Sequence, residues 1–119
     1  MHLLRPLLVA FLLLSLVGCA TVNRFPNVTV YGSAIQIHGV IDSRTPDGVP
    51  EVVVSGASKA LNDRSARYRA LWFDQQSRPI ETVVSAWTEL TLQGERPFSM
   101  RMVGPGERAR SYQVEIEVL

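Results

Sequence analysis

Few residues of this chain could carry out chemistry, and the first of them is its single cysteine, Cys19. A thiolate is a nucleophile that can accept a covalent group, and without a second thiol the chain cannot form an intramolecular disulfide. His38 is the only histidine beyond residue 18, and it occurs in an alternating stretch that predicts a half-exposed position on a strand. No Gly-x-Ser-x-Gly motif accompanies either residue, so the sequence gives no sign of a hydrolase triad.

The other candidates for chemistry are carboxylates and thioethers. The carboxylates are dispersed, and adjacency forces no pair of them together as glycoside hydrolysis would require. Met100 and Met102 form a Met-x-Met pair that suits Cu(I), but with Phe98 they also form an apolar face at strand period, which is typical of a core strand. The sequence therefore predicts no enzyme, no cofactor and no metal site. A small-ligand or Cu(I)-binding role is the alternative, decided by whether the two methionines reach solvent, and an enzyme would require a cleft around His38.

The amino-terminal segment predicts a targeting signal. Met1–Arg5 is short and basic, and Leu7–Val17 is an apolar run of 11 residues. A helix needs about 20 apolar residues to span a bilayer, so this run is typical of a signal peptide. The run ends in Leu16-Val17-Gly18-Cys19, which resembles the bacterial lipobox. We therefore expect residues 1–18 to form a signal-peptide helix in the precursor, cleavage between Gly18 and Cys19, and a lipid attached to Cys19.

Lipidation would attach the mature chain to a membrane. A single acyl chain binds a bilayer only marginally, whereas two or three anchor a protein stably. An aspartate directly after the lipidated cysteine tends to retain such proteins in the inner membrane, and this chain has Ala20 there. We expect the periplasmic face of the outer membrane, with residues 19–26 as a lipidated tether.

The charge balance excludes some classes of partner. Of the 119 residues, 12 are Lys or Arg and 11 are Asp or Glu; removing residues 1–18 takes away Arg5 and leaves 11 of each sign in 101 residues. A neutral chain with scattered charges has neither the basic footprint of a nucleic-acid-binding protein nor a polybasic patch for anionic lipid. The remaining length suffices for one domain, expected over residues 27–119, and nothing in it implies a small-molecule substrate.

Period-two alternation dominates the mature chain and predicts short strands separated by turns. A Gln93-Gly94-Glu95 hairpin turn is expected between two of them. The pattern favours an all-β fold, an immunoglobulin-like antiparallel β-sandwich of about seven strands with Trp72 at the centre of its core. The strand-like stretches are residues 27–31, 35–41, 51–57, 67–74, 80–84, 89–92, 97–103 and 111–118.

The stretch around Trp72 also predicts an interaction face. If Tyr68, Ala70 and Trp72 face the core, alternation sends Arg67, Arg69, Leu71 and Phe73 to the opposite face of the strand. Arginine beside apolar anchors is a composition enriched at protein interfaces, so Arg69, Leu71 and Phe73 are the candidate interaction face. In the alternative interpretation, the amino-terminal segment or long polar residues shield these side chains, and Glu115 and Glu117 pair with the arginines.

Several motifs of this chain resemble the YcfL family of small bacterial lipoproteins. They are the Leu61-Asn62 turn, the strand Tyr68-Arg69-Ala70-Leu71-Trp72-Phe73-Asp74, the Leu90-Thr91-Leu92 strand and the alternating strand from Tyr112 to Val118. The resemblance implies an immunoglobulin-like sandwich in the periplasm and an unknown function. We therefore expect a membrane-anchored periplasmic lipoprotein that acts as a non-enzymatic protein-interaction or structural module of the cell envelope, with an envelope protein as its partner.

Overall fold

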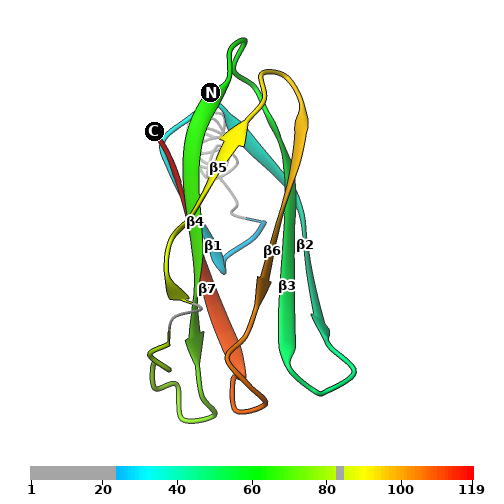
Figure 1. Ribbon diagram of the computed structural model, residues 1–119, viewed down its shortest axis with the longest axis vertical. Helices are drawn as coiled ribbons and strands as arrows, with labels where there is room; N and C mark the ends of the chain where they lie inside the picture. The colour runs from blue at the N-terminus through cyan, green and yellow to red at the C-terminus, as the bar shows by residue number, and fades with distance from the viewer. Residues whose placement is uncertain (1–23, 83–84) are drawn as a thin grey trace, which may run out of the picture.

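A computed structural model describes residues 24–82 and 85–119, and Figure 1 shows the strands in this part of the chain. The predicted signal peptide, Cys19 and the tether up to residue 23 lie outside the described residues. The strands are β1 (Val28–Tyr31), β2 (Ile35–Arg44), β3 (Pro50–Ser58), β4 (Arg64–Phe73), β5 (Thr88–Leu92), β6 (Pro97–Val103) and β7 (Ser111–Val118).

The strands form two sheets that pack as a sandwich. One sheet has the order β1-β7-β4-β5 and the other the order β2-β3-β6. The all-β sandwich of about seven strands predicted from the alternation is confirmed. One pair departs from the antiparallel expectation, because β1 runs parallel to β7, with Val28 opposite Val114 and Tyr31 opposite Glu117.

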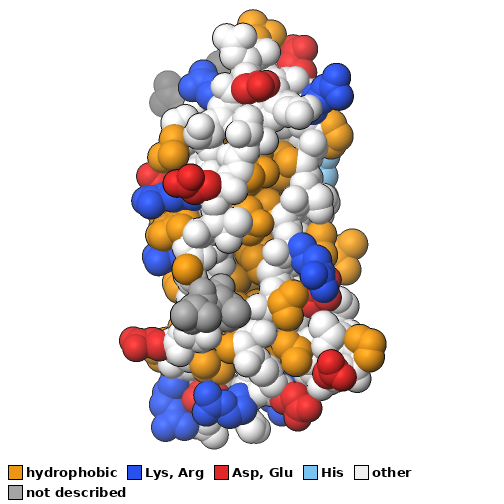
Figure 2. Space-filling model, viewed as in Figure 1, with side chains coloured by type: hydrophobic (Ala, Val, Ile, Leu, Met, Phe, Trp, Pro, Cys, Tyr) orange, Lys and Arg blue, Asp and Glu red, His pale blue; other side chains and the backbone are white. Residues whose placement is uncertain are grey.

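The core forms because successive residues of each strand face opposite sides of its sheet. Along β3, Val52 and Val54 are buried, and along β6, opposite them, Met102 and Met100 are buried. Val114 and Ile116 of β7 close the same layer from the other sheet. Figure 2 shows apolar side chains in the strip between the sheets and charged side chains along the flanks and at the ends. Burial of this apolar layer is the main stabilising contribution to the fold.

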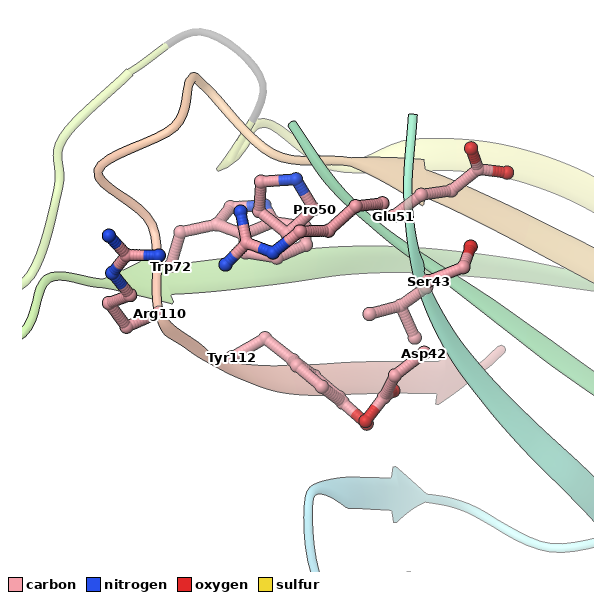
Figure 3. A pocket seen from close by; sticks show the side chains of 9 residues that line it. Asp42, Ser43, Pro50, Glu51, Trp72, Arg110 and Tyr112 are labelled. Atoms are coloured by element: carbon pink, nitrogen blue, oxygen red, sulfur yellow. The ribbon is translucent and has the colours of Figure 1, made fainter. Parts of the chain in front are cut away.

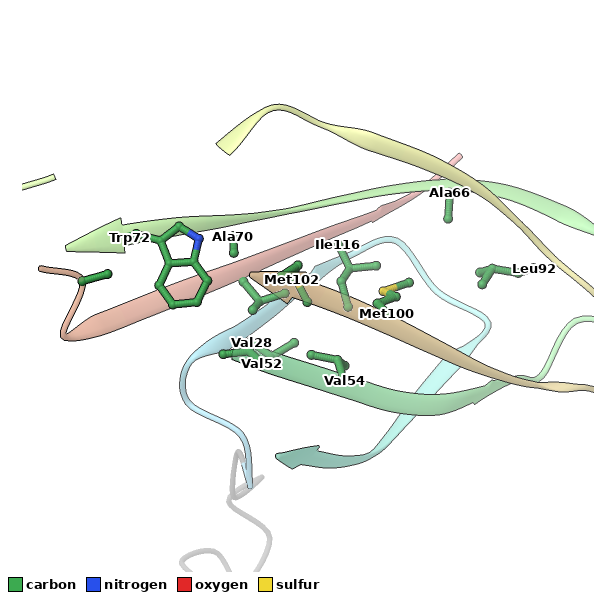
Figure 4. Packing of buried hydrophobic residues seen from close by; sticks show 12 residues of the cluster. Val28, Val52, Val54, Ala66, Ala70, Trp72, Leu92, Met100, Met102 and Ile116 are labelled. Carbon is green, nitrogen blue, oxygen red and sulfur yellow. The ribbon is translucent and has the colours of Figure 1, made fainter. Parts of the chain in front are cut away.

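Trp72 is buried as predicted, but it lies at one end of the core and not at its centre. Its side chain is 2% exposed, and Figure 4 shows it at one end of the cluster, with Leu92 at the other. The reason is its position in β4, where it is the second-last residue of a ten-residue strand. The centre of the core is instead filled by smaller side chains, including Val54, Met100 and Ile116.

Two local predictions were wrong. Gln93-Gly94-Glu95 is no hairpin turn, because β5 and β6 belong to different sheets and the chain crosses between them there. This crossing is held by the preceding turn: the backbone N–H of Glu95 donates to the carbonyl of Ala60, and that of Gly94 donates to the Asp63 carboxylate. The strand expected over residues 80–84 is absent from its described part, residues 80–82, beside which only an isolated bridge joins Phe73 to Pro79.

The first described residues already belong to the domain. Phe25, which falls within the predicted tether, packs against the core, and its carbonyl accepts a hydrogen bond from the N–H of Val28 at 3.0 Å. The carbonyl of Asn27 accepts one from the N–H of Val114 at 2.7 Å. The segment that enters β1 is therefore fixed to the sandwich from Phe25 onward.

Candidate functional site: an outer sheet face and an end cavity

The alternation of β4 places the predicted interaction face on the outside of its sheet. Ala70 and Trp72 are 1% and 2% exposed on the inner side, which leaves Arg67 and Arg69 on the outer side. The register places Arg67 opposite Glu117 and Arg69 opposite Glu115 on β7. Both arginines use this placement, with ion pairs of 2.7 Å to Glu117 and 3.0 Å to Glu115. The predicted alternative, in which these glutamates pair with the arginines, is confirmed for this part of the face.

A residue that the sequence did not single out, Trp87, covers both ion pairs. It lies in the connection between β4 and β5, and the guanidinium carbons of Arg67 and Arg69 lie 4.4 and 4.3 Å from the centre of its ring. Each cation–π contact contributes about 0.5–1 kcal/mol at a partly exposed site. Each exposed ion pair adds at most about 1 kcal/mol. The combined effect is to hold two long side chains in fixed positions on the outer face.

Leu71 and Phe73 continue the same face beyond the arginines. Both are half-buried, and they lie opposite Gln113 and Ser111 of β7, whose side chains offer little apolar cover. The structure thus brings the three predicted residues, Arg69, Leu71 and Phe73, onto one continuous strip of β4. Arg69 is already engaged by Glu115 and Trp87, whereas Leu71 and Phe73 present partly exposed apolar surface.

The residues considered for catalysis or metal binding do not form a site. His38 is exposed at a point where the register between β2 and β3 shifts, between Ile37 and Gly39. Within residues 24–82 and 85–119, no group of three or more His, Cys, Asp or Glu side chains could hold a metal ion. Met100 and Met102 are 0% and 8% exposed within the apolar core. Both thioethers are therefore buried, whereas the Cu(I)-binding alternative required them to reach solvent.

A cavity of about 290 Å³ lies between the sheets at the Trp72 end of the core. Figure 3 shows Trp72 and Tyr112 from one sheet, Pro50 and Asp42 from the other, and Arg110 from the β6–β7 connection. The Trp72 and Tyr112 ring centroids are 6.0 Å apart with a tilt of 53°. The lining residues are Asp42, Ser43, Arg44, Pro50, Glu51, Val52, Trp72, Arg110 and Tyr112. The sequence pattern could not indicate this cavity, because its walls come from three separate parts of the chain.

Tyr112 links the two sheets across this cavity. Its hydroxyl donates to the Asp42 carboxylate at 2.6 Å. Burial, followed by the hydrogen bond to Asp42, raises the pKa of Tyr112 to about 12. The phenol is therefore neutral at any physiological pH and acts as a donor that fixes Asp42.

Two other carboxylates near this end are also committed to partners. A hydrogen bond from Arg101, whose Nε lies 2.5 Å from the Glu51 carboxylate, lowers the pKa of Glu51. The backbone N–H of Arg78 donates to Asp74 at 3.0 Å and lowers the pKa of Asp74, aided by the N–H of Gln76. These acids therefore stay ionised over the ordinary pH range and serve to hold local structure.

In the described part of the chain, no helix is long and apolar enough to cross a membrane.

The family of this chain follows from a match that spans every described strand. Residues 27–118 match a family described as a protein of unknown function, DUF1425. The chain belongs to the DUF1425 family. The match includes the β4 and β7 residues that carried the resemblance to the YcfL family, and a family of unknown function is what that resemblance implied. Among curated proteins, none matches this chain.

Two solved structures share the fold of this sandwich, and one of them is a DUF1425 family member. The Campylobacter jejuni protein cj0090 has a TM-score of 0.65 and 18% sequence identity, over 78% of this chain and 98% of that one. A DUF1425 family member from a Shewanella species has a TM-score of 0.61 and 18% identity, over 69% of this chain and 75% of that one. At this identity the likeness establishes the fold alone, so the chemistry of the site must be argued from this chain's own residues.

Proposed function

We propose that this DUF1425 protein is a lipid-anchored module of the bacterial cell envelope that binds another envelope protein and catalyses no reaction. The observation that carries the proposal is the outer face of β4. There, half-buried Leu71 and Phe73 directly follow Arg69, which is held by Glu115 and Trp87. We name Arg69, Leu71 and Phe73, together with Trp87, the β4 docking face.

The composition of the β4 docking face suits protein recognition. Aromatic residues and arginine are enriched at the centres of protein interfaces, and a few such residues supply most of the binding free energy. Binding is usually weakened by the entropy lost when flexible side chains are immobilised. Here the ion pair and the stacking on Trp87 have already immobilised Arg69. A partner with an apolar projection that covers Leu71 and Phe73 would therefore lose little further side-chain entropy on this side.

Anchoring rests on the lipobox-like sequence that ends at Cys19. Phe25 packs on the core, so the free segment between the lipid and the domain would be residues 19–24. Six extended residues reach at most about 22 Å, since each adds about 3.3–3.6 Å. A short tether would keep the domain beside its membrane, and the expected partner is consequently a protein in or close to the same membrane.

The docking face is tested with Phe73→Glu in the full-length protein. Cells that produce the protein are treated with a crosslinker, and the crosslinked species is purified from membranes. The matched control is Ile41→Glu, which places the same charge on an apolar residue that is 64% exposed on the other sheet. We expect one crosslinked species to be lost in Phe73→Glu and retained in Ile41→Glu. Both variants should keep melting temperatures within about 3 °C of the original, as surface substitutions do.

Two results would contradict the docking face. If Phe73→Glu unfolds the domain, Phe73 belongs to the core. If both variants retain the same crosslinked species, the partner binds elsewhere. In either case the anchor can still be judged separately, by the variant described next.

The anchor is tested with Cys19→Ala. Because Cys19 is the only thiol in the chain, the variant should lose labelling by radioactive palmitate and accumulate as an unprocessed precursor. Cys19→Ser is a second variant that keeps a hydroxyl of similar size but lacks the nucleophilic sulfur. Palmitate labelling that persists in both variants would disprove lipidation at this position.

A further inference from the structure

The end cavity carries more positive charge than its walls neutralise. Of its charged lining residues, Asp42 accepts the Tyr112 hydroxyl and Glu51 is held by Arg101. Arg44 donates to the carbonyl of Gly48 at 2.6 Å. The Arg110 side chain forms no hydrogen bond or ion pair with any residue of the described ranges. Glu51 is thus paired with a cation from outside the cavity, whereas the neutral Tyr112 hydroxyl leaves the charge of the Asp42 carboxylate in place. Because neither Arg44 nor Arg110 has a carboxylate partner, these charged residues together with Arg101 carry one net positive charge.

Arg110 also faces a neighbouring cavity with further basic residues. This second cavity, of about 240 Å³, is lined by Arg78, Arg108 and Arg110 together with Asp74 and two glutamines. Asp74 is occupied by its own turn and by Arg78. Figure 2 shows basic side chains gathered at this lower end of the molecule, beside acidic ones. Arg110 therefore lines both cavities, and no acidic side chain in the described residues forms an ion pair with it.

The walls of the first cavity are apolar next to Arg110. Trp72 and Tyr112 lie on one side and Pro50 on the other (Figure 3), and Val52 also lines the cavity. A volume of about 290 Å³ lies near the lower limit for ligand pockets. It suits a single amino-acid residue or a small organic acid, but not a folded domain.

We infer that the end cavity binds a carboxylate attached to a small apolar group. The planar guanidinium of Arg110 offers two parallel N–H donors, which match the two oxygens of a carboxylate. Its apolar body would lie between Trp72 and Pro50. Such a group could be the carboxyl-terminal residue of a peptide or a free small acid, and both have the same chemistry. This site is separate from the β4 docking face, so either one can be absent without the other.

The test measures binding of N-acetyl-leucine to the full-length protein in detergent micelles. The chain has two tryptophans, so Trp87→Phe leaves Trp72 as the fluorescent reporter at the cavity wall. Control probes are N-acetyl-leucinamide, which lacks the carboxylate, and inorganic phosphate. A five-residue peptide ending in leucine, with either a free or an amidated carboxyl terminus, distinguishes a chain terminus from a free acid.

We expect N-acetyl-leucine to bind in the low millimolar range, as is usual for so small a ligand, and the amide at least about tenfold more weakly. Arg110→Gln should weaken binding about tenfold, since it removes a charge-assisted bidentate contact. Arg96→Gln is the matched control, because Arg96 is an exposed arginine at the distant β5–β6 crossing. That variant should bind within about twofold of the parent.

The peptides decide the source of the carboxylate. Tighter binding of the free-terminus peptide than of N-acetyl-leucine would assign the site to a chain terminus, and weaker binding would assign it to a small acid. The inference is overturned if the amide binds as well as the acid, if Arg110→Gln behaves like Arg96→Gln, or if no probe changes the Trp72 signal. Phosphate that competes as well as N-acetyl-leucine would also overturn it, because the cavity would then be a general anion site.

Discussion

The hydroxyl of Tyr112 gives this fold an alkaline limit that can be predicted from its surroundings. Tyr112 on β7 donates to Asp42 on β2 at 2.6 Å, so one proton joins the two sheets. Burial first, and then the hydrogen bond to Asp42, raises the pKa of Tyr112 to about 12. In the unfolded chain a tyrosine titrates near its ordinary pKa of about 10. The folded protein therefore retains this proton at pH values where the unfolded chain has lost it.

The sign of the pH dependence follows from this difference. Between pH 10 and 12 the unfolded state binds fewer protons than the folded state, so the free energy of unfolding falls as the pH rises. The contribution is complete below about pH 10 and lost above about pH 12. Two pKa units correspond to at most about 2.7 kcal/mol. Because Tyr112 is half-buried at the rim of a cavity, solvent screening reduces the expected value to about 1–2 kcal/mol.

Urea unfolding of the original protein and of Tyr112→Phe at pH 9 and pH 12 measures this contribution. The variant removes the titrating hydroxyl and keeps the ring, so every other ionisable group is common to the two proteins. At pH 9 the variant should be about 1 kcal/mol less stable, because it lacks one hydrogen bond. Between the two pH values the original protein should lose about 1–2 kcal/mol more than the variant. Equal losses would refute the reasoning, since they would mean that the Tyr112 proton is held no more tightly in the fold than in the unfolded chain.

Two further substitutions test the packing. Trp72→Ala should lower the free energy of unfolding by about 3–5 kcal/mol, the range for deleting a large buried aromatic side chain. Urea unfolding measures this change, and a loss below about 1 kcal/mol would show that the indole is not part of the core. Gly56→Ala should lower the free energy of unfolding by about 1–3 kcal/mol or more. The added Cβ would collide with the backbone oxygen of Gln36 and would lie 2.8 Å from Cζ of Phe98. Gly106→Ala is its control, with no atom within 4 Å of the added carbon, and an equal melting temperature for the two variants would contradict the close approach at Gly56.

Period-two alternation predicted much of the fold and the facing of the central strand. It correctly assigned Ala70 and Trp72 to the inside of β4 and Arg69 to the outside. This succeeds because the side-chain direction along a strand depends only on the parity of the position. The same reasoning predicted the alternative in which the two glutamates of β7 pair with the two arginines of β4. Side chains alternate between the two faces along both strands, so Glu117 and Glu115 share the outer face with Arg67 and Arg69.

The features that sequence reasoning missed depend on which strands become neighbours. Trp87 covers Arg67 and Arg69, although it follows Arg69 by 18 positions and lies in an irregular connection without a period to reveal its direction. The crossing at Gly94 resembles a hairpin turn locally, and only its contact with the turn at Asp63 shows that the chain changes sheets. Likewise, the cavity at Arg110 exists because the end of β2, the start of β3, the end of β4 and the start of β7 meet at one end of the sandwich.

The parallel pairing of β1 with β7 has a mechanical consequence. If the chain is anchored at Cys19, any tension between the membrane and a bound partner enters the domain through the amino end of β1. Four residue pairs in register, from Val28–Val114 to Tyr31–Glu117, connect β1 to β7. A pull along the strand loads these pairs together in shear, whereas a pull across it would break them one after another. If the chain is anchored at Cys19, the β1 edge would therefore share such a load among several residue pairs at once.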